Sequence, residues 1–378
     1  MNKISIVFVC GSLEPGCDGV GDYTRRLAGE VFRQGHEVAI LSVNDKHVLK
    51  KIEEVQESDG TFIKVLRIPD ACTYNEKISI SKFFIESKKP DLLSLQCVLF
   101  AFEDRGLPFK IGRVFKQLGG DTKWHIMFHE LWVGMETSAS KKVVFWGWVQ
   151  KQIISSLIKK IHPAIIHTNT RVYQRQLNKI GIKSKLLPLF SNIPVLASGA
   201  KRDNNNISFV IFGSIHSFTD IEQFASEVAE LCKRNKIGAL LIMLGRCGDK
   251  QKYWLDAWTR AGLLVDILGE QPPELVSKVL LTANFGISTT PVELIGKSGT
   301  IAAMREHGLP IISIASEWRA RGLTTSELPD YVYRYIPGSL DLNDARTCST
   351  LTINKLHQVA KVFTDDLLVV RDKKATCI

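Results

Sequence analysis

One stretch constrains the fold more than any other, and it covers residues 285–312, FGISTTPVELIGKSGTIAAMREHGLPII. It begins with a short apolar run that predicts a buried strand, and Pro291 and Gly296 then mark a loop. Residues 301–305 have helical composition and stop at Gly308, after which a second apolar run predicts another strand. A strand, loop, helix and strand in this order indicate an α/β fold with a parallel sheet.

The loop before that helix favours an anionic ligand. The first backbone N–H groups of a helix lack partners within it, and the helix dipole adds positive charge at the same end. The residues expected to surround the anion are Gly296, Lys297, Ser298, Gly299 and Thr300. Glu293 in the same loop would repel a phosphate, so its carboxylate is better interpreted as an acceptor for sugar hydroxyls. The loop therefore predicts a site for a sugar attached to a phosphate.

Length and charge narrow the class of protein. A chain of 378 residues is too long for one ordinary hydrophobic core, so we expect two domains. The net charge of +10 favours an anionic partner, although a lysine-rich solvated surface would also account for it. The net charge is the only feature that favours nucleic acid, and we do not expect nucleic acid as a partner.

The cysteines and the apolar runs indicate a cytoplasmic location. The eight cysteines are scattered without a Cys-x-x-Cys pair, which is typical of a reducing compartment rather than of a disulfide or zinc framework. No apolar run approaches the ~18 residues of a membrane-spanning helix. Residues 1–10 lead straight into a glycine-containing loop and predict a first core strand rather than a targeting segment.

The start of the chain has a βαβ pattern of its own. The pattern predicts in turn a strand, a loop, an amphipathic helix and a second strand at residues 4–10, 11–22, 23–34 and 37–42. Gly19 and Gly21 fit the dinucleotide-binding fingerprint, but Thr24 stands where its third glycine belongs. The glycines either shape a turn or let a ligand approach the backbone closely.

A histidine follows another predicted strand of this half. Residues 124–128 are apolar and lead into His129 and Glu130. Ligands of open α/β sheets bind at the carboxyl ends of the strands, which favours a functional role for His129 over a purely structural one.

Residues 138–161 predict a helix that mixes aromatic and basic side chains. Such a helix can lie at an anionic bilayer surface, so peripheral membrane contact stays open. The commoner explanation is a core-facing helix with its lysines in water, and we expect Trp146 and Trp148 to belong to the core.

A second half begins after a polar segment. Residues 197–206 lack apolar periodicity and predict a linker between domains at 1–196 and 207–354. The next strand ends at Gly213 and Ser214, and a later one ends near Arg246. We expect a terminal helix within residues 355–378 to return and complete the first domain.

These local patterns together resemble the retaining glycosyltransferases of family 4, which have the GT-B fold. The matching residues are Gly19-Val20-Gly21-Asp22-Tyr23, Gly35-His36, Phe128-His129-Glu130, Leu187 to Pro194, Pro291 to Gly296, Met304 and Gly308-Leu-Pro310. The resemblance covers essentially the whole chain and implies two doubly wound Rossmann-like domains facing across a cleft.

The resemblance also implies roles for the two halves. The C-terminal half would hold a nucleotide-sugar donor and the N-terminal half an acceptor, which could be a saccharide, a lipid-linked molecule or a natural product, with neither metal nor cofactor. Glu293 would bind the donor sugar, His129 would lie beside that sugar, and the loop at Gly19 to Asp22 would approach the donor phosphate. Asp22, Tyr23 and Glu130 would face the acceptor.

Two departures separate the chain from that family. Ile301 stands where the family has a second glutamate, so the carboxylate that grips the ribose is missing. The basic pair expected after the first C-terminal strand is replaced by residues 213–216, which leaves Arg246 and Lys297 as substitutes. A non-catalytic sugar-nucleotide-binding protein and an epimerase of the same fold remain alternatives. A dehydrogenase has only Asn44 and Asp45 as weak candidates for its ribose-binding acid.

Overall fold

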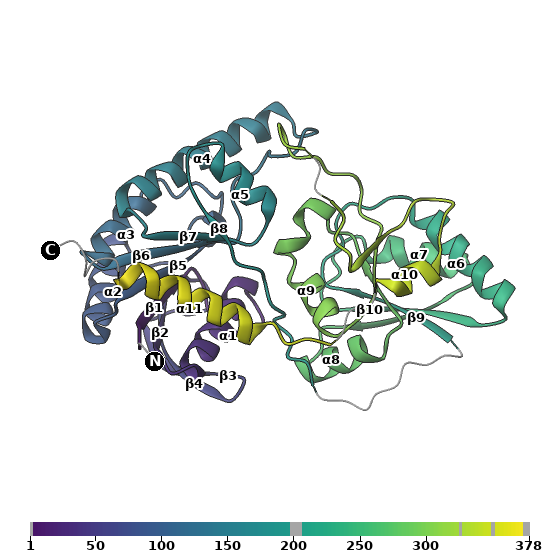
Figure 1. Cartoon of the computed structure of the whole chain (residues 1–378), viewed down its shortest axis with the longest axis horizontal. Helices are drawn as coiled ribbons and strands as arrows, with labels where there is room; N and C mark the ends of the chain where they lie inside the picture. The colour runs from purple at the N-terminus through teal and green to yellow at the C-terminus, as the bar shows by residue number, and fades with distance from the viewer. Residues whose placement is uncertain (1–2, 197–205, 325–326, 349–351, 373–378) are drawn as a thin grey trace. The chain divides into compact units, whose positions relative to one another are not determined.

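The chain forms two compact units (Figure 1). A computed structural model describes residues 3–196, 206–324, 327–348 and 352–372. Unit 1 comprises Met1–Pro188, Ala320–Leu323 and Leu356–Ile378, and unit 2 comprises Leu189–Arg319 and Thr324–Lys355. The chain thus leaves unit 1 after Pro188, whereas most of the predicted linker, residues 197–205, lies outside the described residues.

Unit 1 is built on an eight-stranded sheet with the order β3-β4-β2-β1-β5-β6-β7-β8. Its strands are β1 (Ser5–Cys10), β2 (Glu37–Asp45), β3 (Ile52–Ser58), β4 (Thr61–Pro69), β5 (Leu92–Cys97), β6 (Lys123–Phe128), β7 (Ile165–Thr168) and β8 (Lys185–Leu186). Its α-helices are α1 (Gly19–Arg33), α2 (Tyr74–Lys88), α3 (Ile111–Gly119), α4 (Lys141–Ile161), α5 (Arg171–Asn178) and α11 (Leu356–Asp372), and η1 (Leu99–Ala101) is a 3-10 turn.

The burial of the strands explains the parallel sheet. All six residues of β5 are buried, as are the last five of β1 and of β6, because helices cover both faces of the sheet. The edge strand β3 runs antiparallel to β4 and mixes buried with exposed residues. Strand β3 was not predicted, because its polar IEEVQES pattern lacks the apolar run of a central strand.

Helix α1 begins earlier than predicted. The Asp18 carboxylate accepts a hydrogen bond from the N–H of Val20 at 2.9 Å and so caps the helix, whose first residue is Gly19. The prediction that the helix starts at Tyr23 is therefore wrong, because glycines in the first turn of a helix were interpreted as part of the loop.

Unit 2 contains a six-stranded parallel sheet with the order β11-β10-β9-β12-β13-β14. Its strands are β9 (Asn206–Phe212), β10 (Gly238–Leu244), β11 (Leu264–Gly269), β12 (Phe285–Ser288), β13 (Ile311–Ser313) and β14 (Val332–Arg334). Its α-helices are α6 (Ile221–Asn235), α7 (Gln251–Arg260), α8 (Pro273–Thr282), α9 (Gly299–Glu306) and α10 (Leu342–Thr347), and η2 (Val292–Lys297) is a 3-10 helix.

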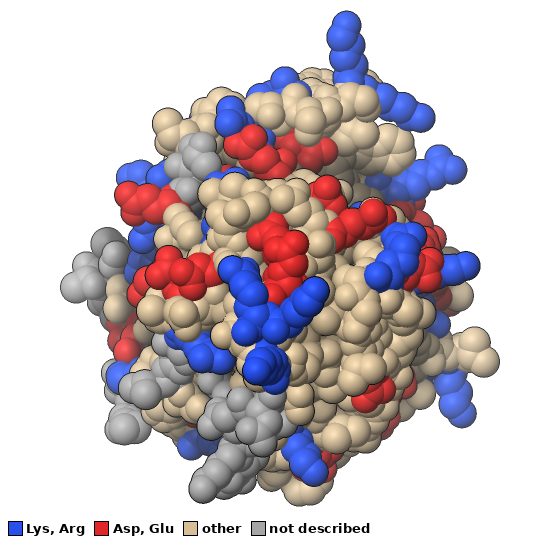
Figure 2. Space-filling model, turned by 90° about the vertical axis from the view of Figure 1, so that its right-hand side faces the viewer, with Lys and Arg blue, Asp and Glu red and all other residues tan. Residues whose placement is uncertain are grey.

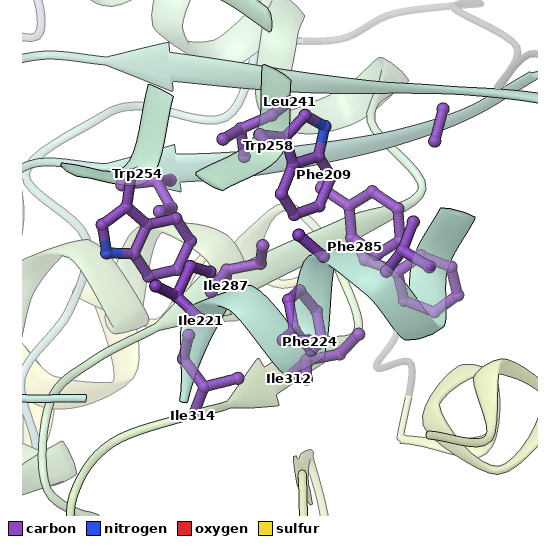
Figure 3. Close-up of a cluster of buried hydrophobic side chains, with 14 of the residues drawn as sticks. Phe209, Ile221, Phe224, Leu241, Trp254, Trp258, Phe285, Ile287, Ile312 and Ile314 are labelled. Carbon is purple, nitrogen blue, oxygen red and sulfur yellow. The ribbon is translucent and has the colours of Figure 1, made fainter. Parts of the chain in front are cut away.

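An aromatic cluster fills one face of the unit 2 sheet (Figure 3). Phe209 on β9 packs against Trp258 on α7 with ring centroids 5.6 Å apart, and it stacks on Phe285 of β12 at 5.5 Å. All three side chains are fully buried. This packing fixes the positions of β9 and β12, whose carboxyl ends lead into the predicted donor loops.

Helix α4 turns several of its aromatic residues away from the core. Trp148 is 54% exposed and stacks on Phe145, which is 65% exposed. Trp146 is half-buried, and its indole N–H donates to the Arg105 carbonyl at 3.0 Å. The expectation that both tryptophans belong to the core is wrong for Trp148, because the buried stripe of the helix consists of Gly147, Gln150, Ile153, Ile154, Leu157 and Ile161.

The surface charge is mixed on the face shown in Figure 2. Lysine and arginine side chains stand there among acidic ones and broad areas of other residues. None of the helices in the described part of the chain combines the length and the apolar character that crossing a bilayer requires.

Candidate functional site

The first turn of α1 lies at the carboxyl end of β1, and its two glycines differ in what they require. A Cβ on Gly21 would stand 2.8 Å from the Ser12 carbonyl oxygen, so only glycine fits this helix against the preceding loop. A Cβ on Gly19 would meet no atom within 4 Å, so packing does not explain that glycine. The backbone at Gly19 is open to close approach by a ligand.

Two predicted site residues of unit 1 meet in the structure. The rings of Tyr23 on α1 and His129 after β6 touch edge to face, with centroids 4.8 Å apart. His129 Nε2 is hydrogen-bonded to Gln96 Oε1 at 3.0 Å. Burial lowers the pKa of His129 to about 3, so its imidazole is neutral at physiological pH.

The other acceptor-side candidates have different surroundings. The Asp22 carboxylate accepts from the Arg25 guanidinium at 2.7 Å and from the Gly16 N–H at 3.1 Å, so it is held by its own helix and loop. Glu130 is half-buried directly after His129. Their assignment to an acceptor stays a prediction.

The acid required by a dehydrogenase is not available for a ribose. Asp45 ends β2, but it is fully buried and its Oδ2 accepts from Arg67 Nε at 2.7 Å and from the Leu13 N–H at 3.1 Å. Its Oδ1 accepts from the His47 N–H at 3.0 Å. Although burial opposes the shift, these hydrogen bonds lower the pKa of Asp45, which is a structural anion.

A largely apolar cavity, called the hollow below, lies in unit 1. It encloses about 290 Å³ between α2, α3 and the end of β2, and its lining includes Val43, Phe102 and Phe115. Lys77 also lines it and donates to Asn44 Oδ1 at 2.6 Å. Such a hollow suits a ligand with an apolar body.

Two predicted donor segments of unit 2 lie against each other. Gly213 follows β9 with φ +77°, and a Cβ there would stand 2.9 Å from Thr300 Cγ2 in the first turn of α9. Glycine is required at this position by both the backbone angle and the close approach. Ser298 caps α9 by accepting from the Ile301 N–H at 3.3 Å, and its hydroxyl also contacts Thr300 Oγ1 at 3.0 Å.

A basic cluster surrounds the loop after β9. Desolvation first, and then the positive charges of Lys297 and Lys250, lower the pKa of His216. Lys250 Nζ donates to the His216 carbonyl at 2.7 Å, and the His216 N–H donates to Thr289 Oγ1 at 2.8 Å. Lys297 was predicted from the sequence as a site residue, whereas Lys250 was not. Its position in the loop after β10 was the available signal.

Arg246, the other predicted substitute, pairs with Glu270. The Arg246 guanidinium contacts both carboxylate oxygens of Glu270, one of them at 3.1 Å, and both side chains are well exposed. Ser214 is exposed beside Gly213. Gly296 is likewise exposed, within η2. A phosphate role for these residues stays a prediction.

Glu293 lies in the first turn of η2. The burial of Ile301 shows why its position has no glutamate. Glu293 and Arg334 both line a small cavity of about 40 Å³. Desolvation raises the pKa of Glu293, and the positive charge of Arg334 opposes this shift. Ile301 is 2% exposed and belongs to the apolar core around α9, so its position faces the protein interior rather than a ligand.

The arrangement in unit 2 is suited to an anion. Backbone N–H groups at the start of α9, the glycine at 213 and the basic cluster of His216, Lys250 and Lys297 all follow carboxyl ends of parallel strands. Among the described residues, no group of three or more His, Cys, Asp or Glu side chains is arranged to hold a metal ion.

Comparison with solved structures identifies the fold. No family model and no curated protein sequence matches the chain. The chain is similar over 98% of its length to the whole catalytic domain of starch synthase IV from Arabidopsis thaliana bound to ADP and acarbose, with a TM-score of 0.56 and 10% identity. It also matches HepE from Anabaena in complex with UDP and glucose (TM-score 0.53, 15% identity, 98% of each chain).

An epimerase has the same architecture. A UDP-N-acetylglucosamine 2-epimerase matches with a TM-score of 0.56 and 9% identity, over 97% of this chain and 96% of that one. The fold is therefore α/β with two parallel-sheet, Rossmann-like domains, as in GT-B proteins, and the predicted fold class is confirmed at that level.

The buried neutral state of His129 predicts acid sensitivity. The unfolded chain takes up a proton at this residue below its ordinary pKa of 6.5, whereas the folded chain does so only near 3. The stability gained from this difference is complete above pH 6.5 and declines towards pH 3, by about 1.4 kcal/mol for each pH unit.

Between pH 6.5 and pH 3, His129→Gln should therefore reduce the change in the free energy of unfolding by about 1.4 kcal/mol for each pH unit. Urea unfolding at a series of pH values measures this slope. The same substitution at the exposed His47 serves as the control and should leave the slope unaltered. An unchanged slope in His129→Gln would show that the folded protein takes up the proton as readily as the unfolded chain.

Proposed function

We propose that this protein is a metal-independent glycosyltransferase that moves a sugar from a nucleotide-sugar donor to an acceptor hydroxyl with retention of anomeric configuration. The observation that carries the proposal is the basic cluster of His216, Lys250 and Lys297 beside the N-terminus of α9, next to Gly213. Positive charge and unpaired helix N–H groups at one sheet edge suit the diphosphate of such a donor.

The proposed chemistry follows from where charge develops. The bond between the sugar C1 and the diphosphate oxygen breaks, and the cations of unit 2 stabilise the negative charge on the leaving group. A bond forms between C1 and the acceptor oxygen on the same face, and the acceptor proton passes to the departing phosphate oxygen. Glu293 would accept hydrogen bonds from donor sugar hydroxyls, and neutral His129 is proposed to contact a hydroxyl of a bound sugar ligand.

Similarity of fold supports the class of ligand. The matching starch synthase structure contains ADP, and the matching HepE structure contains UDP with glucose. We extend a nucleoside diphosphate ligand to this chain on the strength of its own basic cluster. The epimerase match favours one second candidate, in which a bound UDP-sugar is epimerised rather than transferred.

The acceptor is proposed to have an apolar part. The hollow of about 290 Å³ beside α2 and α3 would receive it, and Lys77 at its wall could contact a polar group of the acceptor. The exposed Phe145 and Trp148 on α4 would let a cytoplasmic protein reach a lipid-linked acceptor by peripheral contact.

The function is tested by incubating the protein with a panel of nucleotide sugars and acceptors and measuring nucleoside diphosphate release together with the products. We expect release to depend on an acceptor. Glu293→Gln should retain the fold and lower turnover at least about tenfold, because a charged hydrogen bond contributes roughly 1.5–3 kcal/mol. Equal turnover of both proteins would reject the role of Glu293, and an epimerised UDP-sugar without transfer would establish the second candidate.

Lys297 should bind the diphosphate. Lys297→Ala is expected to weaken the binding of UDP or ADP, measured by calorimetry, roughly tenfold, since a hydrogen bond to a charged group is lost. The exposed Lys278 on α8 provides the matched control, and Lys278→Ala should bind like wild type. If Lys297→Ala also binds like wild type, the basic cluster is not the diphosphate site.

The exposed face of α4 should bind anionic lipid. Lys141 and Lys142 are exposed near the aromatic pair, and each lysine near an anionic surface contributes about 1 kcal/mol. Co-sedimentation with vesicles containing anionic lipid should fall in Phe145→Ala/Trp148→Ala and at high salt, while Phe83→Ala, at a 77% exposed site on α2, should bind normally. Equal sedimentation of all three proteins would exclude this face as the contact.

A further inference from the structure

A continuous series of hydrogen bonds leads inward from His129. Its Nε2 contacts Gln96 Oε1 at 3.0 Å, and Gln96 Nε2 donates to Ser94 Oγ at 2.8 Å. Ser94 Oγ is in turn hydrogen-bonded to His125 Nδ1 at 2.8 Å. Ser94 and Gln96 lie two residues apart on β5 and so on the same side of the sheet, and Ser94 pairs in register with His125 on β6.

The series continues to helix α11. His125 Nε2 contacts His167 Nδ1 on β7 at 3.0 Å, and His167 Nε2 contacts Asp366 Oδ2 at 3.0 Å. The other oxygen of Asp366 accepts from Lys185 Nζ on β8. Helix α11 is held over this part of the sheet because Phe363 packs edge to face on His125 at 5.2 Å (Figure 1).

The series is closed to solvent along its length. Ser94, Gln96, His125 and His167 are fully buried, and His129 is 5% exposed. Water therefore does not compete for these hydrogen bonds, and each member must be satisfied by its neighbours. At the far end the series reaches the surface, where the Asp366 side chain is 18% exposed and Lys185 59% exposed.

The charge at the surface end fixes the direction of every hydrogen bond. Burial lowers the pKa of His125 and His167, and despite its own burial Asp366 has a lowered pKa because of its hydrogen bonds to Lys185 and His167. Ionised Asp366 can only accept, so neutral His167 carries its proton on Nε2 and accepts at Nδ1.

The same logic then applies to each further member. His125 must donate from Nε2, so its Nδ1 accepts from the Ser94 hydroxyl. Ser94 accepts from the Gln96 amide, whose oxygen accepts from His129 Nε2. His129 is left with a bare Nδ1, for which the described part of the chain supplies no hydrogen-bond partner.

We propose that Asp366, a residue of the C-terminal helix, is a positioning residue that sets the tautomer of His129 through this buried series. Asp366 makes Nδ1 of His129 a hydrogen-bond acceptor, directed to a hydroxyl of the bound ligand. The assignment of that hydroxyl to the donor sugar rests on the proposed function, whereas the tautomer itself does not.

The test exploits the two oxygens of Asp366. In Asp366→Asn the Lys185 ammonium retains the remaining oxygen, so the amide N–H₂ faces His167 and donates to Nε2. His167, His125 and the Ser94 hydroxyl then reverse in turn, and the Gln96 amide turns over. His129 should carry its proton on Nδ1 in this variant and on Nε2 in the wild type.

The tautomers are read by long-range ¹H–¹⁵N NMR of histidine-labelled protein at neutral pH. The chain has nine histidines, and the His129 signals are identified by their loss in His129→Gln. The matched control is Asp365→Asn on the same helix, because the Asp365 side chain is 59% exposed and its carboxylate pairs with Lys361 at 3.1 Å, outside the buried series. It should leave His129 in the wild-type tautomer.

A double variant tests the direction of the effect. Adding Lys185→Met to Asp366→Asn frees the amide to turn its oxygen to His167 and should restore the Nε2–H tautomer of His129. A merely structural role of Asp366 would not be rescued by removal of a second partner. Wild-type His129 with its proton on Nδ1, or Asp366→Asn with an unreversed tautomer, would overturn the proposal, and the wild-type measurement decides even where the variant does not fold.

The ligand role has a separate readout. Asp366→Asn should weaken the binding of the nucleotide sugar roughly tenfold, with little change for the nucleoside diphosphate, because only the sugar meets Nδ1. A reversed tautomer with unchanged sugar affinity would overturn the role assigned to Nδ1. Failure of the wild-type protein to bind any nucleotide sugar would instead reject the proposed function, and the NMR result would stand.

Discussion

Parallel pairing of the central strands is the constraint on which the candidate sites depend. Parallel strands end at the same edge of their sheet, so the loops that follow them are brought together however far apart they lie in the sequence. In unit 1 the loops after β1 and β6 bring Tyr23 to His129. In unit 2 the loop after β9 meets the start of α9, which follows β12.

The two units treat charge differently at these edges. In unit 1, two arginines near this edge form ion pairs within the protein, Arg67 with Asp45 and Arg25 with Asp22. These ion pairs stabilise the loops, so the two guanidinium groups are not available to a ligand. In unit 2 the pKa of His216 is lowered mainly by desolvation, and the positive charges of Lys297 and Lys250 lower it further. An anionic ligand is therefore favoured in unit 2, and neutral groups are favoured beside His129 in unit 1.

Buried polar groups extend the influence of the site into the core. The hydrogen bonds from His129 through Gln96 and Ser94 pass through strands that are otherwise apolar, and each is costly unless it is satisfied. Helix α11, the last helix of the chain, completes this arrangement through Asp366. The return of the chain to unit 1 thus supplies a residue that is hydrogen-bonded to the far end of this series as well as a helix that covers the sheet.

The sequence by itself determined the α/β class, most central strands and the loops at Gly213 and Lys297, because apolar runs, glycines and helix starts are local signals. It did not determine that Trp148 is exposed, that Asp45 forms an ion pair with Arg67, or that Lys250 lies beside His216. These facts depend on which face of a helix meets the sheet and on which distant loops share an edge. Only tertiary packing decides that, since residues such as Ser94 and Asp366 carry no mark of their common hydrogen-bond series until strands and helix are placed together.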